Sequence, residues 1–211
     1  MSAQDCVALF PQDQIPLILD TVLDCASTLR KKSPSELENH LSTRLVKRLQ
    51  VDPRMRGGPF VVCPEYQVLD ESIDDAKHKG HIDICFVTTQ GSHTYFAIEA
   101  KRLHVTFGNG KWTSLVGEYV AGNQGMMCFV TSKYSASQRA GAMLGYVFDG
   151  DTGRARDGIS KAIDSNRKKL KLAGKNGLIQ SGIVQRAERV DETRHQFGHR
   201  PFTIYHLLVS V

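Results

Sequence analysis

The chain has 211 residues, 41% of them hydrophobic, and a net charge of +5. A chain of this length can bury one substantial core, so we expect a single domain spanning residues 1–211. Its apolar runs fall short of the about 18 residues that cross a bilayer, and its N-terminus lacks the basic flank and cleavage site of a secretory signal; both features favour a cytoplasmic protein without membrane contact.

The charge is distributed unevenly along the chain. Residues 154–200 contain twelve Lys and Arg against five Asp and Glu, so this stretch carries +7 and the remainder −2. Clustered cations attract polyanions, which points to a nucleic acid as the partner. A solvated helix face is the simpler alternative for the same pattern.

The five cysteines, at positions 6, 25, 63, 85 and 128, lie far apart and form no C-x-x-C pair. Three of them fall within apolar runs that look like strands. We therefore expect reduced core residues rather than a disulfide framework or a zinc site.

Two helices are predicted near the start of the chain. Apolar residues recur at helical spacing within residues 15–29, which indicates a helix packed on the body. A second helix is predicted over residues 34–50, because Ser33 is a typical N-cap, Pro34 suits the first helical position and Glu36 completes a capping box. One side of this helix is apolar, with leucines at positions 37, 41, 45 and 49.

Three strands are predicted to follow. The first covers residues 60–69, and Pro64 within it indicates an edge strand or a bulge. The next two, near residues 81–88 and 93–100, are joined by a Gln-Gly-Ser turn and form a hairpin. Both hairpin strands are apolar on both faces, as in a sheet that is covered on each side.

The second half of the chain is predicted to mix helices and strands. In order, we expect a short helix over residues 114–122, a strand over 125–132, a helix over 135–148, a basic amphipathic helix over 159–172 and a terminal strand over 201–211. The helix over residues 135–148 is predicted because Ser135 and Gln138 have capping-box spacing. The element order predicts an α/β domain with a mixed central sheet and helices on both faces, preceded by an extra N-terminal helix.

The hairpin also predicts a cluster of charged residues. A turn centred near position 91 pairs residues whose numbers sum to about 182, which places Asp83 opposite Glu99. Carboxylates in directly opposed positions destabilise a strand pair. Lys101 points to the same face as Glu99 and balances one of the two charges.

A divalent cation would resolve this conflict. Two carboxylates with water suit Mg²⁺, which also accepts phosphate oxygens as ligands. A lysine beside the metal can orient or deprotonate water, or stabilise charge on a phosphate. The arrangement is suited to phosphodiester hydrolysis.

With Asp83 on the second strand and Glu99-Ala100-Lys101 on the third, the chain resembles the PD-(D/E)XK nuclease superfamily, whose restriction-endonuclease-like core has the order αβββαβ. The resemblance implies metal ligation by Asp83, by Glu99 and by the backbone carbonyl of Ala100. It also implies a supporting glutamate on the first core helix, for which Glu38 is the best match. It covers roughly residues 34–131 and leaves a basic extension over residues 132–211.

Alternatives remain at several of these positions. Glu36 and Glu65 are rivals of Glu38, although a capping role explains Glu36 without catalysis. Ile82 stands where the superfamily pattern has proline. The simplest alternative for the whole cluster is a structural ion pair at the rim of the sheet.

We expect a Mg²⁺-dependent endonuclease, with Mn²⁺ as a substitute metal; DNA is the favoured substrate, and RNA stays open as the alternative. The resemblance further implies a context in bacterial anti-phage defence beside an ATPase or helicase, and cutting of both strands would require a homo-oligomer. The alternative function is a non-catalytic nucleic-acid-binding or scaffold module. His195, His199 and Arg200 could contact phosphate, although loop positions without a ligand are the simpler interpretation. The absence of a G-x-x-x-x-G-K-[ST] loop argues against ATP hydrolysis.

Overall fold

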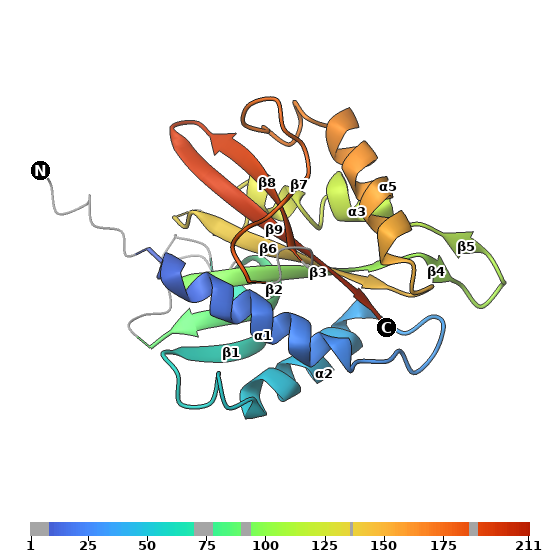
Figure 1. Ribbon diagram of the computed structural model, residues 1–211, viewed down its shortest axis with the longest axis horizontal. Coiled ribbons are helices and arrows are strands. Elements are labelled where there is room, and N and C mark those ends of the chain that lie inside the picture. The colour runs from blue at the N-terminus through green and yellow to red at the C-terminus, as the bar shows by residue number, and fades with distance from the viewer. Residues whose placement is uncertain (1–8, 70–77, 90–93, 136, 186–189) are drawn as a thin grey trace, which may run out of the picture.

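The computed structural model describes residues 9–69, 78–89, 94–135, 137–185 and 190–211. Its centre is a seven-stranded mixed sheet, in which β3, β6 and β9 run parallel and the other pairs are antiparallel (Figure 1). In spatial order the strands are β1 (Phe60–Leu69), β2 (His78–Thr88), β3 (Tyr95–Leu103), β6 (Ala140–Val147), β9 (Arg200–Ser210), β8 (Val190–Phe197) and β7 (Ile179–Gln180).

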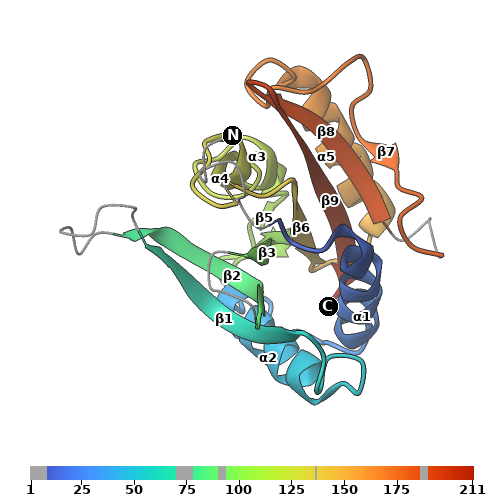
Figure 2. The ribbon, with the colours of Figure 1, turned by 90° about the vertical axis from the view of Figure 1, so that its left-hand side faces the viewer.

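Helices cover both faces of the sheet, as predicted (Figure 2). One face packs against α1 (Ile15–Ser27) and α2 (Glu38–Val51), and the other against α3 (Val116–Val120), α4 (Met127–Val130) and α5 (Thr152–Ser165). Each face has its own apolar core, so the central strands are buried on both sides. The short η2 (Gln12–Gln14) precedes α1, and a two-stranded hairpin of β4 (Val105–Thr106) and β5 (Trp112–Thr113) follows β3.

Several predictions along the chain are confirmed. The helix within residues 15–29, the three strands and the short helix of 114–122 correspond to α1, β1, β2, β3 and α3. The terminal strand corresponds to β9. Strand β1 is an edge strand, and its register shifts between Val68 and Leu69 rather than at Pro64. The mixed α/β class and its sheet are therefore as expected.

The start of α2 differs from the prediction. The helix begins at Glu38, after an N-cap residue, Leu37, that makes no side-chain cap. Ser33 is thus not the cap, and the capping box is wrong. Glu36 instead accepts a hydrogen bond from the backbone N–H of Lys32 and forms a 2.9 Å ion pair with Arg44, which satisfies its buried carboxylate.

The predicted strand of 125–132 and helix of 135–148 are both wrong, because the two element types are exchanged. The first segment contains α4, and the second contains β6 at the centre of the sheet. A Cβ atom on Gly141 would overlap the Phe129 ring, and one on Gly145 would overlap the side chains of Leu103 and Leu208. Glycines in β6 therefore allow close packing on the face that α3 and α4 cover, and this need outweighed the capping signal.

The basic helix is shifted from its predicted range of 159–172. Helix α5 begins at Thr152, because the carboxylate of Asp151 caps it by accepting a 2.9 Å hydrogen bond from the backbone N–H of Arg154. It ends at Ser165, although Leu170 is still buried. The residues that lead into the terminal strand were expected to form a loop, but they form β8.

Four cysteines, at positions 25, 63, 85 and 128, have free thiols; Cys85 and Cys128 are buried core residues as predicted, whereas Cys25 and Cys63 are only partly buried. Cys128 lies in α4 rather than in a strand. Cys6 lies outside the described residues. Within the described ranges, the helices are all too short or too polar to cross a lipid bilayer.

Candidate active site

The two carboxylates predicted to meet lie where strands β2 and β3 stop pairing. The hairpin has the predicted register, since Ile84 pairs with Ile98 and Phe86 with Phe96. Asp83 directly precedes Ile84 in β2, and its Oδ2 accepts a 2.7 Å hydrogen bond from the backbone N–H of Ala100. An aspartate side chain thus takes the place of a backbone partner at the end of the ladder.

Glu99 is buried, with 3% of its surface exposed. Its Oε1 accepts a 3.0 Å hydrogen bond from Lys101 Nζ, whereas its Oε2 is buried without a hydrogen-bond partner among the described residues. Burial and the nearby Asp83 raise the pKa of Glu99 to about 7, and Lys101 and the nearby backbone N–H of Gly125, which falls short of hydrogen-bond geometry with Oε2, oppose that rise. An unpartnered buried carboxylate oxygen is costly, so it marks a position suited to a cation.

Lys101 places its ammonium group among oxygen atoms. Besides Glu99, it donates a 2.7 Å hydrogen bond to the carbonyl of Ala100 and lies 3.6 Å from Oε1 of Glu38. Burial disfavours the charged form, but Glu99, Asp83 and Glu38 outweigh it and raise the pKa of Lys101 to about 12. The pKa of Asp83 is also raised, mainly by burial. Lys101 is thus a fixed cation within the acidic cluster that Asp83 and Glu99 form.

The structure also places the rival glutamates. Glu38, the first residue of α2, reaches both Lys101 and Arg102, with its Oε2 2.9 Å from Arg102 Nε. Glu36 is held by Arg44 and is structural. Glu65 lies in β1 between Pro64, which pairs with Ile84 of β2, and Tyr66, which pairs with Ile82. Its charge also raises the pKa of Asp83. Glu38 and Glu65 therefore both border the cluster.

A second lysine near the cluster was missed in the sequence. The side chain of Lys133 passes over Gly80 of β2, where a Cβ atom would overlap its Cε, and its Nζ lies 3.3 Å from Oε1 of Gln124. The neighbouring Tyr134 donates a hydrogen bond to the backbone carbonyl of His81. This turn therefore holds the start of β2 just before Asp83. No local sequence pattern links residue 133 to residue 80, so only the folded chain reveals this contact.

The cluster fits a hard cation in its donor chemistry. Two carboxylates and one backbone carbonyl provide oxygen ligands, which Mg²⁺ and Mn²⁺ prefer. Within the described ranges, no group of three or more His, Cys, Asp and Glu side chains is arranged to hold a metal. A site of two carboxylates with a carbonyl has fewer such side chains, and here the lysine ammonium already lies against Glu99 and the Ala100 carbonyl.

The remaining candidates from the sequence do not join the cluster. His195 is buried in β8, where its Nδ1 donates to the carbonyl of Leu170 and its Nε2 accepts from the hydroxyl of Thr193, both at 2.8 Å. Its burial lowers its pKa to about 4, so it is a neutral core residue and not a phosphate contact. His199 lies in the turn between β8 and β9. The guanidinium of Arg200 donates to the backbone carbonyls of Ser135 and Gln138, which explains it structurally.

Comparisons with protein-family models, with curated proteins and with solved structures found no match to this chain.

Proposed function

We propose that this protein is a metal-dependent nuclease that hydrolyses phosphodiester bonds, with DNA as the favoured substrate. The observation that carries the proposal is the unpartnered buried Oε2 of Glu99, which lies in a cluster with Asp83 and Lys101. A strongly perturbed carboxylate beside a second carboxylate and a lysine is typical of a catalytic site. Apart from the intervening β4, β5 and α4, the order α2, β1, β2, β3, α3, β6 is consistent with the restriction-endonuclease-like core.

In the proposed reaction, a water oxygen forms a bond to phosphorus and the bond from phosphorus to a sugar oxygen breaks. The water proton passes to bulk solvent, from which the departing sugar oxygen takes up a proton. Asp83, Glu99 and the carbonyl of Ala100 would hold Mg²⁺, which supplies charge stabilisation and an acidified water when bound. Lys101 would leave the carbonyl of Ala100 and turn its ammonium toward the phosphate or the attacking water. Glu38, held by Arg102, keeps Lys101 oriented.

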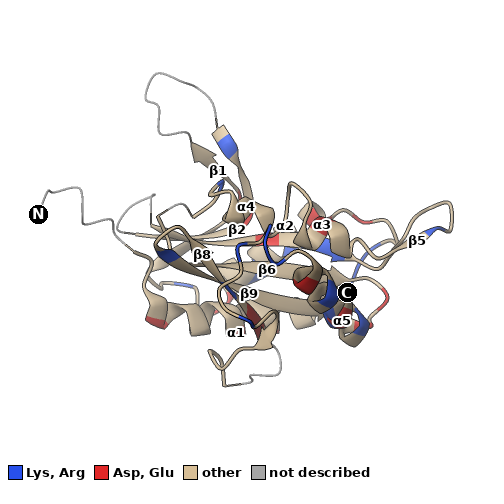
Figure 3. Cartoon of the chain, turned by 90° about the horizontal axis from the view of Figure 1, so that it is seen from above, with Lys and Arg blue, Asp and Glu red and all other residues tan. Residues whose placement is uncertain are grey.

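Basic residues on the α3 and α4 side support a nucleic-acid partner. Lys169 donates a 2.6 Å hydrogen bond to the carbonyl of Ala121, and Lys171 lies 3.4 Å from the carbonyl of Val130. These contacts fold the basic segment after α5 onto the elements that border Glu99 (lysine and arginine positions are blue in Figure 3). Together with Lys133 they offer phosphate contacts, which position a nucleic acid without reading its sequence.

The test is cleavage of plasmid DNA, single-stranded DNA and RNA with Mg²⁺, with Mn²⁺ and with EDTA. Asp83→Asn and Lys101→Ala are expected to abolish cleavage, whereas Asp164→Asn, a carboxylate paired with Arg167 on α5, serves as the matched control and retains it. No cleavage of any substrate by the wild-type chain contradicts the proposal.

A non-catalytic nucleic-acid-binding module is the second candidate. One contact favours it: Lys101 already occupies the carbonyl of Ala100, which a metal would need, and also holds Oε1 of Glu99. Binding of nucleic acid that persists without cleavage under every condition supports this module. Action in anti-phage defence beside an ATPase, and homo-oligomerisation, stay predictions that pull-down and sedimentation experiments can test.

A further inference from the structure

A pocket of about 420 Å³ lies between α1 and the start of α5, away from the acidic cluster. It lies along the end of β9, where Leu208, Val209 and Ser210 line it. Its volume is within the range of small-molecule sites, which is about 300–1,000 Å³. The nuclease proposal makes no use of this pocket.

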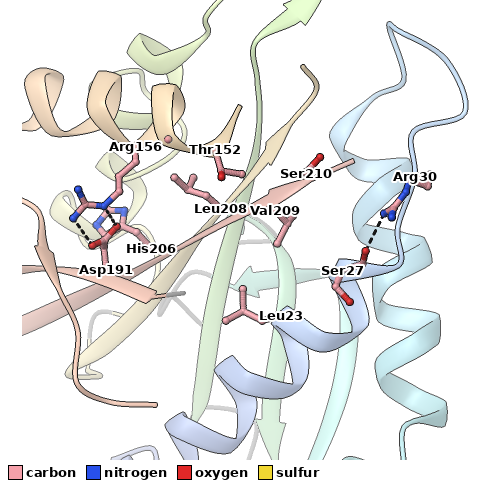
Figure 4. Close-up of a pocket in the computed structure, with 11 residues that line it drawn as sticks. Leu23, Ser27, Arg30, Thr152, Arg156, Asp191, His206, Leu208, Val209 and Ser210 are labelled. Atoms are coloured by element: carbon pink, nitrogen blue, oxygen red, sulfur yellow. Dashed lines mark hydrogen bonds and ion pairs between the residues drawn. The ribbon is translucent and has the colours of Figure 1, made fainter. Parts of the chain in front are cut away.

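The pocket has two polar ends and an apolar middle (Figure 4). Arg30 and Ser27 of the α1 end lie at one side, and Arg156 with Asp191 lies at the other. Leu208, Val209 and Leu23 lie between them. A ligand that fills the pocket therefore carries polar groups at both ends and a flat or apolar centre.

The Arg30 end is suited to an anion. Its guanidinium Nη1 donates to the carbonyls of Ser27 and Leu29, at 2.9 and 2.6 Å, which fixes the group in place. Across the described ranges, Arg30 forms no ion pair with a carboxylate, so its charge is uncompensated. The hydroxyl of Ser210 lines the same end, whereas that of Ser27 donates a 2.7 Å hydrogen bond to the carbonyl of Asp24. A positioned guanidinium beside a hydroxyl group is suited to phosphate recognition.

The Arg156 end is neutral overall and offers both a donor and an acceptor. Nε and Nη2 of Arg156 each donate a 2.7 Å hydrogen bond to Asp191, which leaves Nη1 as a donor beside the remaining lone pairs of the carboxylate. The wall behind them is His206, whose two ring nitrogens are already bonded to Tyr119 and Thr193. Such a pair suits the edge of a nucleobase, which also presents donors beside acceptors.

We propose that this pocket binds a nucleoside monophosphate. The phosphate lies against Arg30, the base edge against Arg156 and Asp191, and the sugar and base faces over Leu208 and Val209. Both ends contribute, so neither inorganic phosphate nor a nucleoside alone satisfies the site. This inference does not depend on the nuclease proposal, because it uses none of the acidic cluster.

Calorimetric titration of the full chain tests this site. The probes are AMP, GMP, CMP and UMP, with the four matching nucleosides and inorganic phosphate for comparison, all in EDTA so that no divalent ion brings phosphate to the acidic cluster. We expect saturable one-to-one binding of at least one monophosphate. For the nucleotide that binds, Arg30→Gln weakens affinity about tenfold or more and leaves binding of the matching nucleoside unchanged. Thr152→Trp, which fills the pocket from α5, abolishes binding.

Arg154→Gln is the matched control, because Arg154 lies on the same helix as Arg156 but pairs with Asp149 outside the pocket. Its affinity is expected to equal that of the wild type. The proposal is overturned by any of three results: no saturable binding of the four nucleotides up to about 5 mM, equal binding by wild type, Arg30→Gln and Thr152→Trp, or inorganic phosphate binding as tightly as every nucleotide.

Discussion

The Oδ2 atom of Asp83 accepts a 2.7 Å hydrogen bond from the backbone N–H of Ala100, and so joins β2 to β3 where their backbone ladder ends. One carboxylate therefore has a structural partner inside the cluster that is proposed to hold a metal. The two roles can be separated by substitution, because a neutral amide can also accept this hydrogen bond.

Asp83→Ala is expected to lower the free energy of unfolding by about 1–3 kcal/mol, because it leaves the N–H of Ala100 without its acceptor. Asp83→Asn keeps an acceptor and should lose much less. Urea unfolding at pH 7 measures both. Equal stability of the two variants would contradict a structural role for the carboxylate, whereas both variants should be inactive in cleavage if the metal is held here.

Glu99→Gln is expected to stabilise the metal-free protein above pH 7. The pKa of Glu99 is about 7 in the folded state, above its ordinary value of 4.5, so its ionisation opposes folding increasingly as pH rises from 4.5 through 7. Below pH 4.5 the carboxyl is neutral in both states, and the gain from the substitution disappears. Urea unfolding at pH 4 and pH 8 in EDTA measures this, and a pH-independent difference contradicts the buried, unpartnered carboxylate.

Acid is expected to destabilise the core around His195 and His206. Burial lowers their pKa values to about 4 and about 3, below the ordinary value of 6.5. The unfolded chain therefore binds protons first, and stability falls as pH drops from 6.5 toward 4. Between pH 6.5 and 5 the loss is on the order of 2 kcal/mol per histidine. Glu99 contributes the opposite trend over the same range.

The comparison variant for this effect is His195→Gln, which cannot take up a proton. Its unfolding free energy should change less between pH 6.5 and 5 than that of the wild type, whatever its starting stability. Identical pH slopes in the two proteins would show that His195 is not held neutral by the hydrogen bonds to Leu170 and Thr193.

Lys133 is expected to contact the substrate backbone. Lys133→Ala should weaken nucleic-acid binding and reduce the slope of log affinity against log salt by about one, as the loss of one phosphate contact does. Gly80→Ala should have a smaller effect of the same sign, because its Cβ displaces the lysine side chain. Fluorescence anisotropy at several salt concentrations measures both. Lys47→Ala, on α2, is the control, and an equal effect there would mean that Lys133 acts only through net charge.

The sequence carried much of the information on the site, because hairpin geometry is local. A short turn fixes the register, and the register brings Asp83 next to Glu99 and Ala100. The candidate role of Glu38 also followed from the sequence, because Glu38 lies in the predicted helix over residues 34–50. The position of Lys133 could not be predicted from the sequence, because its contact with Gly80 depends on how the turn after α4 lies over β2.

The sequence was less informative between residues 125 and 148. Ser135 and Gln138 have the spacing of a helix start, yet Ser135 adopts a left-handed backbone conformation with φ 54° and donates its N–H to the hydroxyl of Tyr95. The following segment is a fully buried central strand, whose glycines allow neighbouring side chains to approach. Packing on both faces of a sheet is a tertiary property, so local capping signals misassigned this segment.

Crystals grown with Mn²⁺ test most directly whether Asp83 and Glu99 hold a divalent ion. We predict an anomalous peak at roughly 2.0–2.3 Å from oxygens of both carboxylates and of the Ala100 carbonyl, with the ammonium of Lys101 moved off that carbonyl. A map without a peak at saturating Mn²⁺, in which Lys101 still donates to Ala100 and Glu99, would contradict the metal-dependent mechanism.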